Sequence, residues 1–115
     1  MPMHLDRTKN LFSGGVDIRD RQALLGEVLA ASIELVSLED NDFAWSSWGD
    51  RAEAVKELSG YAAALESGGW PDINQMSVVF APTGPMQELS LSSGWGESFV
   101  KLASFFDAAA GDQSK

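Results

Sequence analysis

Residues 80–96 most constrain the fold of this chain, because they are the part that no regular period explains. Each of the two prolines, Pro82 and Pro85, fixes φ and lacks an N–H group, so a regular helix cannot cross either one without losing hydrogen bonds. The stretch is nevertheless too apolar for a solvated linker, since it contains Phe, Met, Trp and two Leu. We therefore predict a structured Pro/Gly loop that packs on the core.

The rest of the chain has the three- and four-residue spacing of apolar positions that is typical of amphipathic helices. This spacing predicts four helices, over residues 17–38, 47–67, 72–80 and 97–109. Asp17 and Asp20 lie at the start of the first helix, where carboxylates cap free N–H groups. Ser47 and Asp50 have the spacing of a capping box, which starts the second helix near residue 47. The predicted fold class is mainly α, a small single-domain bundle of about four helices.

One alternative for the region around the prolines is a short β-hairpin. Residues 76–81 include the strand-favouring run Val78-Val79-Phe80, and residues 87–92 alternate leucines with serines. Two such strands could pair through a turn at residues 82–85. Pro71 favours a helix over 72–80 instead, because helices tolerate proline in their first turn.

The length of the chain suits one domain. With 115 residues, of which 44% are apolar, it can bury a core but is too short for two. Residues 1–16 end in Ser13-Gly14-Gly15 and lack a helical period, so we predict a flexible N-terminal arm. We expect the helical domain to cover residues 17–111 and residues 112–115 to form a tail.

Acidic residues dominate the charge: 17 Asp and Glu against 8 Lys and Arg give a net charge of −9. Two long stretches, residues 22–50 and 57–100, contain no Lys or Arg. Such a field repels phosphate backbones and attracts basic surfaces, so we expect a basic protein partner and no nucleic acid. Solubility alone also explains surplus acid, and both explanations stay open.

The sequence lacks the features of several other classes of protein. It contains no Cys, so disulfides and thiol chemistry are excluded, which fits a reducing compartment. No apolar run approaches the roughly 18 residues of a membrane span, and the first residues lack the pattern of a signal peptide. We therefore expect a cytoplasmic protein without membrane contact.

No motif indicates catalysis or the binding of a metal or cofactor. The single histidine, His4, lies in the predicted arm, so a serine triad or a His-rich metal site lacks its residues. The acids of residues 39–42 resemble the start of a calcium loop, but Ala44, Trp45 and Arg51 stand where ligands and a glycine belong. We predict no catalytic residue, no metal site and no cofactor.

Small bacterial proteins of unknown function carry a segment that resembles Phe80-Ala81-Pro82-Thr83-Gly84-Pro85-Met86-Gln87 followed by Gly94-Trp95. The resemblance extends over roughly residues 43–107 and includes Trp45-Ser46-Ser47-Trp48. It implies a recurrent small fold, and it brings no activity or catalytic residue to this chain.

Two hypotheses for the function follow. The first is a non-enzymatic, acidic protein-binding domain, such as an inhibitor or immunity-type protein, that engages a basic partner. The alternative is a small ligand-binding or enzymatic domain with a pocket under the 80–96 loop. The candidate residues of the acidic face are Glu34, Glu39, Asp40 and Asp42. Those of the loop are Thr83, Gln87, Glu88 and Trp95, with Phe80 and Trp48 as further walls of the pocket.

Overall fold

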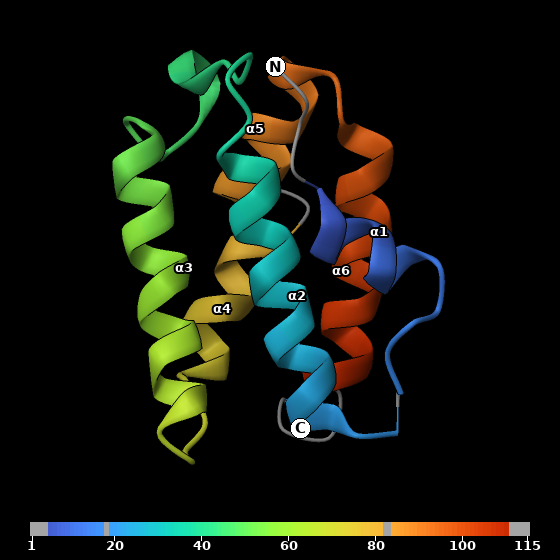
Figure 1. Ribbon diagram of the computed structural model, residues 1–115. Helices are drawn as coiled ribbons and strands as arrows, with labels where there is room; N and C mark the ends of the chain where they lie inside the picture. Colours follow the sequence, from blue (N-terminus) through green and yellow to red (C-terminus); the bar gives the residue numbers. More distant parts are fainter. Residues whose placement is uncertain (1–4, 18, 82–83, 111–115) are drawn as a thin grey trace.

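A computed structural model of the chain describes residues 5–17, 19–81 and 84–110 (Figure 1). Over these residues the chain forms six α-helices, one short 3-10 helix and no strand. The elements are α1 (Asp6–Phe12), α2 (Arg21–Val36), η1 (Phe43–Trp45), α3 (Arg51–Glu66), α4 (Ile73–Val79), α5 (Pro85–Ser93) and α6 (Gly96–Ala110). The mainly α fold class is confirmed, and the helices outnumber the four that the sequence predicts.

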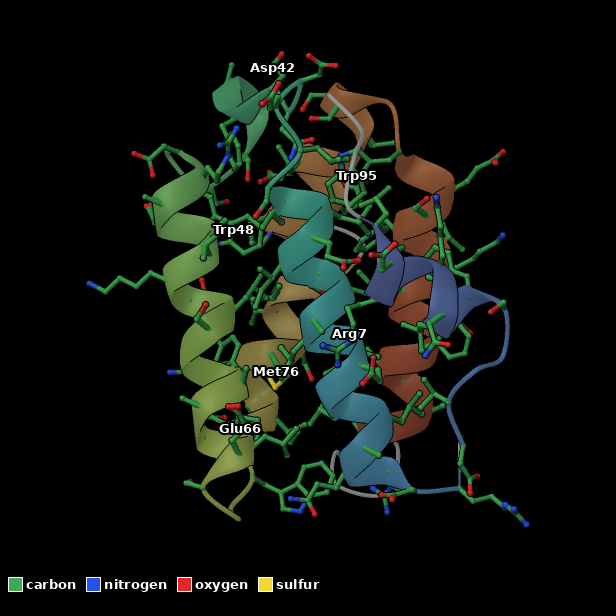
Figure 2. The ribbon with its side chains drawn as sticks, in the orientation of Figure 1. Arg7, Asp42, Trp48, Glu66, Met76 and Trp95 are labelled. Atoms are coloured by element: carbon green, nitrogen blue, oxygen red, sulfur yellow. The ribbon has the colours of Figure 1, made fainter. Side chains whose placement is uncertain are left out.

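Helix α2 lies at the centre of the bundle, with α3 on one side and α6 on the other (Figure 1). Asp20 caps its start, since the carboxylate accepts a hydrogen bond from the Ala23 amide at 3.1 Å. One core collects side chains from all six α-helices, including Leu11, Leu25, Leu58, Met76, Leu89 and Leu102 (Figure 2). The apolar spacing over residues 17–38 therefore does mark the central helix, although the helix begins only at Arg21.

Helix α3 begins later than predicted. Its N-cap is Asp50 rather than Ser47, since the Asp50 carboxylate accepts from the Glu53 amide at 2.9 Å. Glu53 in return accepts from the Gly49 amide at 3.2 Å, as in a capping box shifted by one residue. Ser47 instead donates its amide and its hydroxyl to Glu88, at 2.9 and 3.1 Å, and so ties the start of α3 to α5.

The predicted loop over residues 80–96 is wrong in its main part, because Pro85–Ser93 form α5. Pro85 occupies the first helical turn, where its missing N–H costs nothing, so it begins this helix instead of interrupting one. Gly94 ends the helix in the left-handed conformation, with a φ of 86°. The hairpin alternative is also wrong, because its two strands would fall on α4 and α5.

Helix α1 occupies part of the segment for which the sequence predicts a flexible arm, residues 1–16. It is seven residues long, contacts α2 and lies in front of α6 in the view of Figure 1. Leu11 is buried, and the Phe12 ring stacks on Phe105 of α6 at a centroid distance of 6.2 Å. The predicted tail, residues 112–115, lies outside the described residues.

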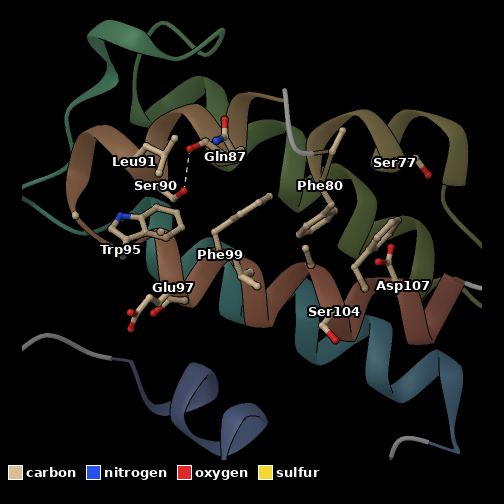
Figure 3. Close-up of a pocket in the computed structure, with 17 residues that line it drawn as sticks. Ser77, Phe80, Gln87, Ser90, Leu91, Trp95, Glu97, Phe99, Ser104 and Asp107 are labelled. Carbon is tan, nitrogen blue, oxygen red and sulfur yellow. Dashed lines mark hydrogen bonds between the residues drawn. The ribbon is translucent and has the colours of Figure 1, made fainter.

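Helices α4 and α5 follow one another along one flank of α6, and α1 lies on the other flank (Figure 3). The connection between α4 and α5 requires a glycine at Gly84. A Cβ atom there would lie 2.0 Å from the carbonyl oxygen of Val78, closer than any side chain can approach. This close contact sets the position of α5 relative to α4.

Candidate functional site

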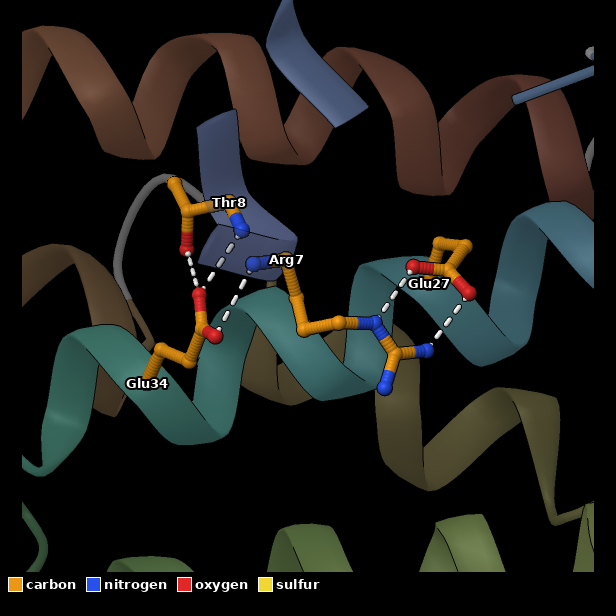
Figure 4. Close-up of polar contacts among 4 residues, drawn as sticks. All are labelled: Arg7, Thr8, Glu27 and Glu34. Atoms are coloured by element: carbon orange, nitrogen blue, oxygen red, sulfur yellow. Dashed lines mark hydrogen bonds and ion pairs between the residues drawn. The ribbon is translucent and has the colours of Figure 1, made fainter. Parts of the chain in front are cut away.

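Two carboxylates of α2 hold α1 in place (Figure 4). Glu34 accepts hydrogen bonds from the amides of Arg7 and Thr8 at 2.9 and 2.7 Å, and from the Thr8 hydroxyl at 2.8 Å. These amides lie in the first turn of α1, where the N-cap residue Leu5 makes no side-chain cap, so Glu34 supplies the cap from another helix. Glu27 pairs with the Arg7 guanidinium through contacts of 3.0 and 2.6 Å.

We call Arg7, Thr8, Glu27 and Glu34 the charged clamp. The hydrogen bond to Glu27 raises the pKa of Arg7 above its ordinary value against the opposing effect of burial, and the charges of Glu27 and Glu34 add to the rise. The sequence places Glu34 on an acidic binding face, whereas in the structure it is half-buried and its carboxylate is hydrogen-bonded to α1. The clamp carboxylates are therefore part of the fold.

The other predicted acids of this face lie in the segment between α2 and α3. Glu39 and Asp40 are exposed in the turn that follows α2. Asp42 is also exposed, and its carboxylate caps η1 by accepting from the Ala44 amide at 2.9 Å. We call residues 39–42 the acidic turn, and it keeps three of the four predicted acids on the surface.

The acidic turn packs on the corner where α5 leads into α6. The Asp42 amide donates to the Ser93 hydroxyl at 2.8 Å, and the Asp42 carbonyl accepts from the Ser92 hydroxyl at 2.7 Å. Asn41 donates to a carbonyl in the last turn of α2, and its side-chain oxygen accepts the indole N–H of Trp95 at 2.8 Å. The carboxylates of the turn therefore lie near the end of α6 that Trp95 precedes (Figure 2).

A groove of about 1300 Å³ lies between α6 and the α4–α5 pair (Figure 3). Its floor is aromatic: Phe99 contributes to it, and the rings of Phe80 and Phe106 stack at a centroid distance of 4.5 Å. Leu91 of α5 and Val100 of α6 line its edges and are 64% and 66% exposed. Because these exposed aliphatic side chains share one groove with an aromatic floor, they differ from single apolar residues scattered on a surface.

The polar residues of the groove lining are four serines, one glutamine and two acids: Ser77, Ser90, Ser98, Ser104, Gln87, Glu97 and Asp107. The hydroxyls of Ser77 and Ser90 each donate to a backbone carbonyl one turn earlier, at 2.8 Å, so they are satisfied within their own helices. The charged side chains of the lining are Glu97 and Asp107, both exposed and both acidic. Neither forms an ion pair with another described residue. The groove thus has an aromatic floor, and both of its charged side chains are negative.

The residues predicted to surround a pocket under the loop separate into two groups. Gln87, Trp95 and Phe80 do line the groove. Glu88 instead holds Ser47, and the Trp48 indole donates to Glu57 of α3 at 2.9 Å. Thr83 lies outside the part of the chain that the structure describes.

Several residues that line the groove are not among the candidates predicted from the sequence. Glu97, Val100, Ser104 and Asp107 recur at three- and four-residue steps, so their common face on α6 can be found once that helix is assigned. The opposite edge, with Leu91, could not be found in this way, because the sequence predicts a loop where α5 stands.

A second, smaller hollow of about 510 Å³ lies beside α3 and includes Glu57 and Tyr61 in its lining. Both oxygens of Glu57 are occupied, one by the Trp48 indole and the other by the Tyr61 hydroxyl. Burial raises the pKa of Tyr61 above its ordinary value, and the hydrogen bond to Glu57 and its charge add to the rise. Glu57 therefore joins Trp48 to α3 by a hydrogen bond.

Among the described residues, no group of three or more His, Asp or Glu side chains is placed to hold a metal ion, and none of the helices has the length and hydropathy of a membrane span. Comparison with protein families, curated proteins and solved structures finds no match for this chain. The resemblance to small bacterial proteins therefore stays a prediction, and the groove and the charges around it are what bear on function.

Proposed function

We propose that this chain is a non-enzymatic protein-binding domain whose contact surface is the groove between α6 and the α4–α5 pair. The observation that carries this proposal is the composition of the groove: exposed Leu91 and Val100 beside charged lining residues that are all acidic. An apolar centre with a polar rim is the usual composition of a protein interface. The negative sign of the rim, and of the chain as a whole, favours a basic partner over a nucleic acid.

The acidic turn adds to this surface at the Trp95 end of the groove. Its exposed carboxylates would attract a basic protein over a distance of about 10 Å at 0.1 M ionic strength, and so would speed the encounter. An inhibitor or immunity-type protein that covers a basic partner in the cytoplasm would use such a surface. The lack of Cys supports that location.

The alternative, a ligand-binding or enzymatic site in the same groove, has less support. A catalytic site needs an acid, base or nucleophile positioned toward a substrate. The hydroxyls of Ser77 and Ser90 are bonded to backbone instead, and Glu97 and Asp107 are exposed at the edge. An open groove with an aromatic floor and exposed aliphatic side chains suits a macromolecular surface better than a small polar ligand.

Photo-crosslinking with the full chain, in the cells that naturally produce it, tests the proposal. A photoreactive amino acid replaces Val100 in the groove or, as a control, Val78 on α4, which is 64% exposed but is not part of the groove lining. We expect a discrete adduct with another protein from Val100 and not from Val78. Changing both Asp40 and Asp42 to Lys should reduce the yield of this adduct. Equal labelling at the two positions, or no adduct from Val100, would contradict the proposal.

A further inference from the structure

We infer that the groove takes an amphipathic α-helix of a partner protein, about three turns long, with apolar side chains on one face and a basic residue near each end. This inference rests on the proposed function, because it names the kind of partner that the proposed surface binds. A helix laid into an apolar groove is a recurrent mode of protein recognition.

The length and charge of the groove fit such a helix. Glu97 and Asp107 are ten positions apart on α6, which corresponds to about 15 Å along the helix axis. A partner helix that lies along the groove could pair one basic side chain with each carboxylate. Its two basic residues would then be about three turns apart. Between the carboxylates, Val100 on one edge and Leu91 on the other offer the apolar contact.

The chain contains one example of this mode of packing within itself. Helix α1 carries Arg7 and Lys9 together with Leu11 and Phe12. It docks by burying Leu11 and stacking Phe12 on Phe105, while Arg7 pairs with an acidic residue of the neighbouring helix. The groove presents the same combination of apolar surface and carboxylates on the other flank of α6 (Figure 3).

A second copy of this chain is a poorer occupant than a basic helix. Each copy has a net charge of −9, so self-association would bring like charges against Glu97, Asp107 and the acidic turn. The only described basic helix of the chain, α1, is already engaged with α2. The charge of the groove therefore selects a helix from a different protein.

The probe for the test is a synthetic helical peptide of about fourteen residues, with leucines on one face and two lysines about ten positions apart. One control peptide has glutamates in place of the lysines, and another has the same composition with the leucines dispersed around the helix. Each is titrated into the whole chain and the dissociation constant is measured by calorimetry. We expect the lysine peptide to bind at least about tenfold more tightly than either control.

Matched variants then show where the peptide binds. Val100→Lys should weaken binding about tenfold or more, because it replaces an apolar contact at the edge of the groove by a positive charge that repels the basic helix. Val78→Lys makes the same change at an equally exposed position outside the groove and should leave the dissociation constant within about twofold. The double change Glu97→Gln and Asp107→Asn should weaken binding at low salt more than at high salt, whereas Glu66→Gln on α3 should not.

The outcomes separate this inference from the proposed function. If Val100 crosslinks to another protein but the lysine peptide does not bind, or binds Val100→Lys equally well, the groove has a different occupant: the proposed function stands and the inference is overturned. If the chain dimerises and Val100→Lys makes it monomeric, the occupant is a second copy, which also overturns it. If neither crosslinking nor peptide binding occurs, both proposals are wrong.

Discussion

The two flanks of α6 are similar in composition and differ in what covers them. On the closed flank, α1 places the Phe12 ring on Phe105, and Lys101 lies 5.6 Å from the centre of the Phe12 ring. On the open flank, which faces the groove, Val100 and Leu91 are 66% and 64% exposed. Apolar surface alone therefore does not determine which flank the chain covers.

The charged clamp accounts for the difference. A helix of seven residues is too short to be stable by itself, so α1 depends on its contacts with the rest of the chain. Those contacts combine apolar burial with a cap from Glu34 and an ion pair between Arg7 and Glu27. The open flank has the apolar surface and the carboxylates, and among the described residues no basic segment covers it.

The largest difference in the free energy of unfolding between the two flanks should appear when one leucine is truncated on each. Leu11→Ala should lower the free energy of unfolding by about 2–4 kcal/mol, because the Leu11 side chain of α1 is buried in the core and the change leaves a cavity. Leu91→Ala on the open flank should change it by less than about 0.5 kcal/mol. Urea denaturation measures both. Equal losses would mean that the two flanks do not differ as described.

The packing of α4 against α5, which together form one side of the groove, should depend on Gly84. Its φ of −86° is accessible to any residue, so the requirement for glycine comes from the 2.0 Å between a Cβ atom and the Val78 oxygen. Gly84→Ala should cost about 1–3 kcal/mol because the backbone must move to relieve this overlap. Gly60→Ala is the control: a Cβ meets nothing within 4 Å there, and the change should stabilise α3 by up to about 1 kcal/mol. A neutral Gly84→Ala in thermal denaturation would show that α4 and α5 are not so closely joined.

The charged clamp predicts a smaller effect at Glu34. Glu34→Ala should cost about 1–2 kcal/mol, because two amides of α1 and the Thr8 hydroxyl lose their acceptor. Glu39→Ala removes an equal charge from the exposed acidic turn and should cost less than about 0.5 kcal/mol. Hydrogen exchange adds a local readout, since the amides of Arg7 and Thr8 should lose protection in the Glu34 variant alone. If Glu39→Ala were the more costly change, Glu34 would not be structural.

The helices of this bundle could be predicted where their signals are local. The periods over residues 17–38, 47–67 and 97–109 mark α2, α3 and α6, because burial against neighbouring helices imposes the spacing. Helix α1 could not be predicted, since its cap, Glu34, lies 26 residues away from Thr8 in the sequence. Helix α5 is not predicted for a different reason. The sequence indicates a break at Pro85, whereas Pro85 begins a helix that packs Met86 and Leu89 into the core.

The candidate site was less predictable than the fold. Gln87 and Trp95 belong to the groove, and the sequence does indicate them. Glu34 could not be recognised as structural, because its partners come from a segment without a period of its own. The groove itself depends on how α4 and α5 align beside α6, which is a property of tertiary packing and leaves no local pattern.

The smallest expected effect is a shift in the titration of Tyr61 when Glu57 is changed. Glu57 is a carboxylate of α3 that, like Glu34, is bonded within the chain. The folded state raises the pKa of Tyr61, so the stability that neutral Tyr61 provides is fully present below about pH 10 and is lost as the pH rises further. Tyr61 is the single tyrosine, so tyrosinate absorbance reports on it alone. Glu57→Gln should lower the pH at which Tyr61 titrates, because it removes the negative charge beside the hydroxyl. An unchanged titration would show that Glu57 does not contact Tyr61 in solution.

Helix α6 has one flank closed by the chain itself, and we propose that the other flank is open to a partner. The most direct measurement is a titration of the isotope-labelled whole chain with the lysine peptide, followed by amide chemical shifts in the NMR spectrum. We expect the largest changes at Leu91, Val100 and neighbouring amides of α5 and α6, and no change at the amides of Arg7 and Thr8. If the largest changes instead occur at α1 and α2, the peptide has displaced α1 from the charged clamp, and the closed flank, not the groove, is the binding surface.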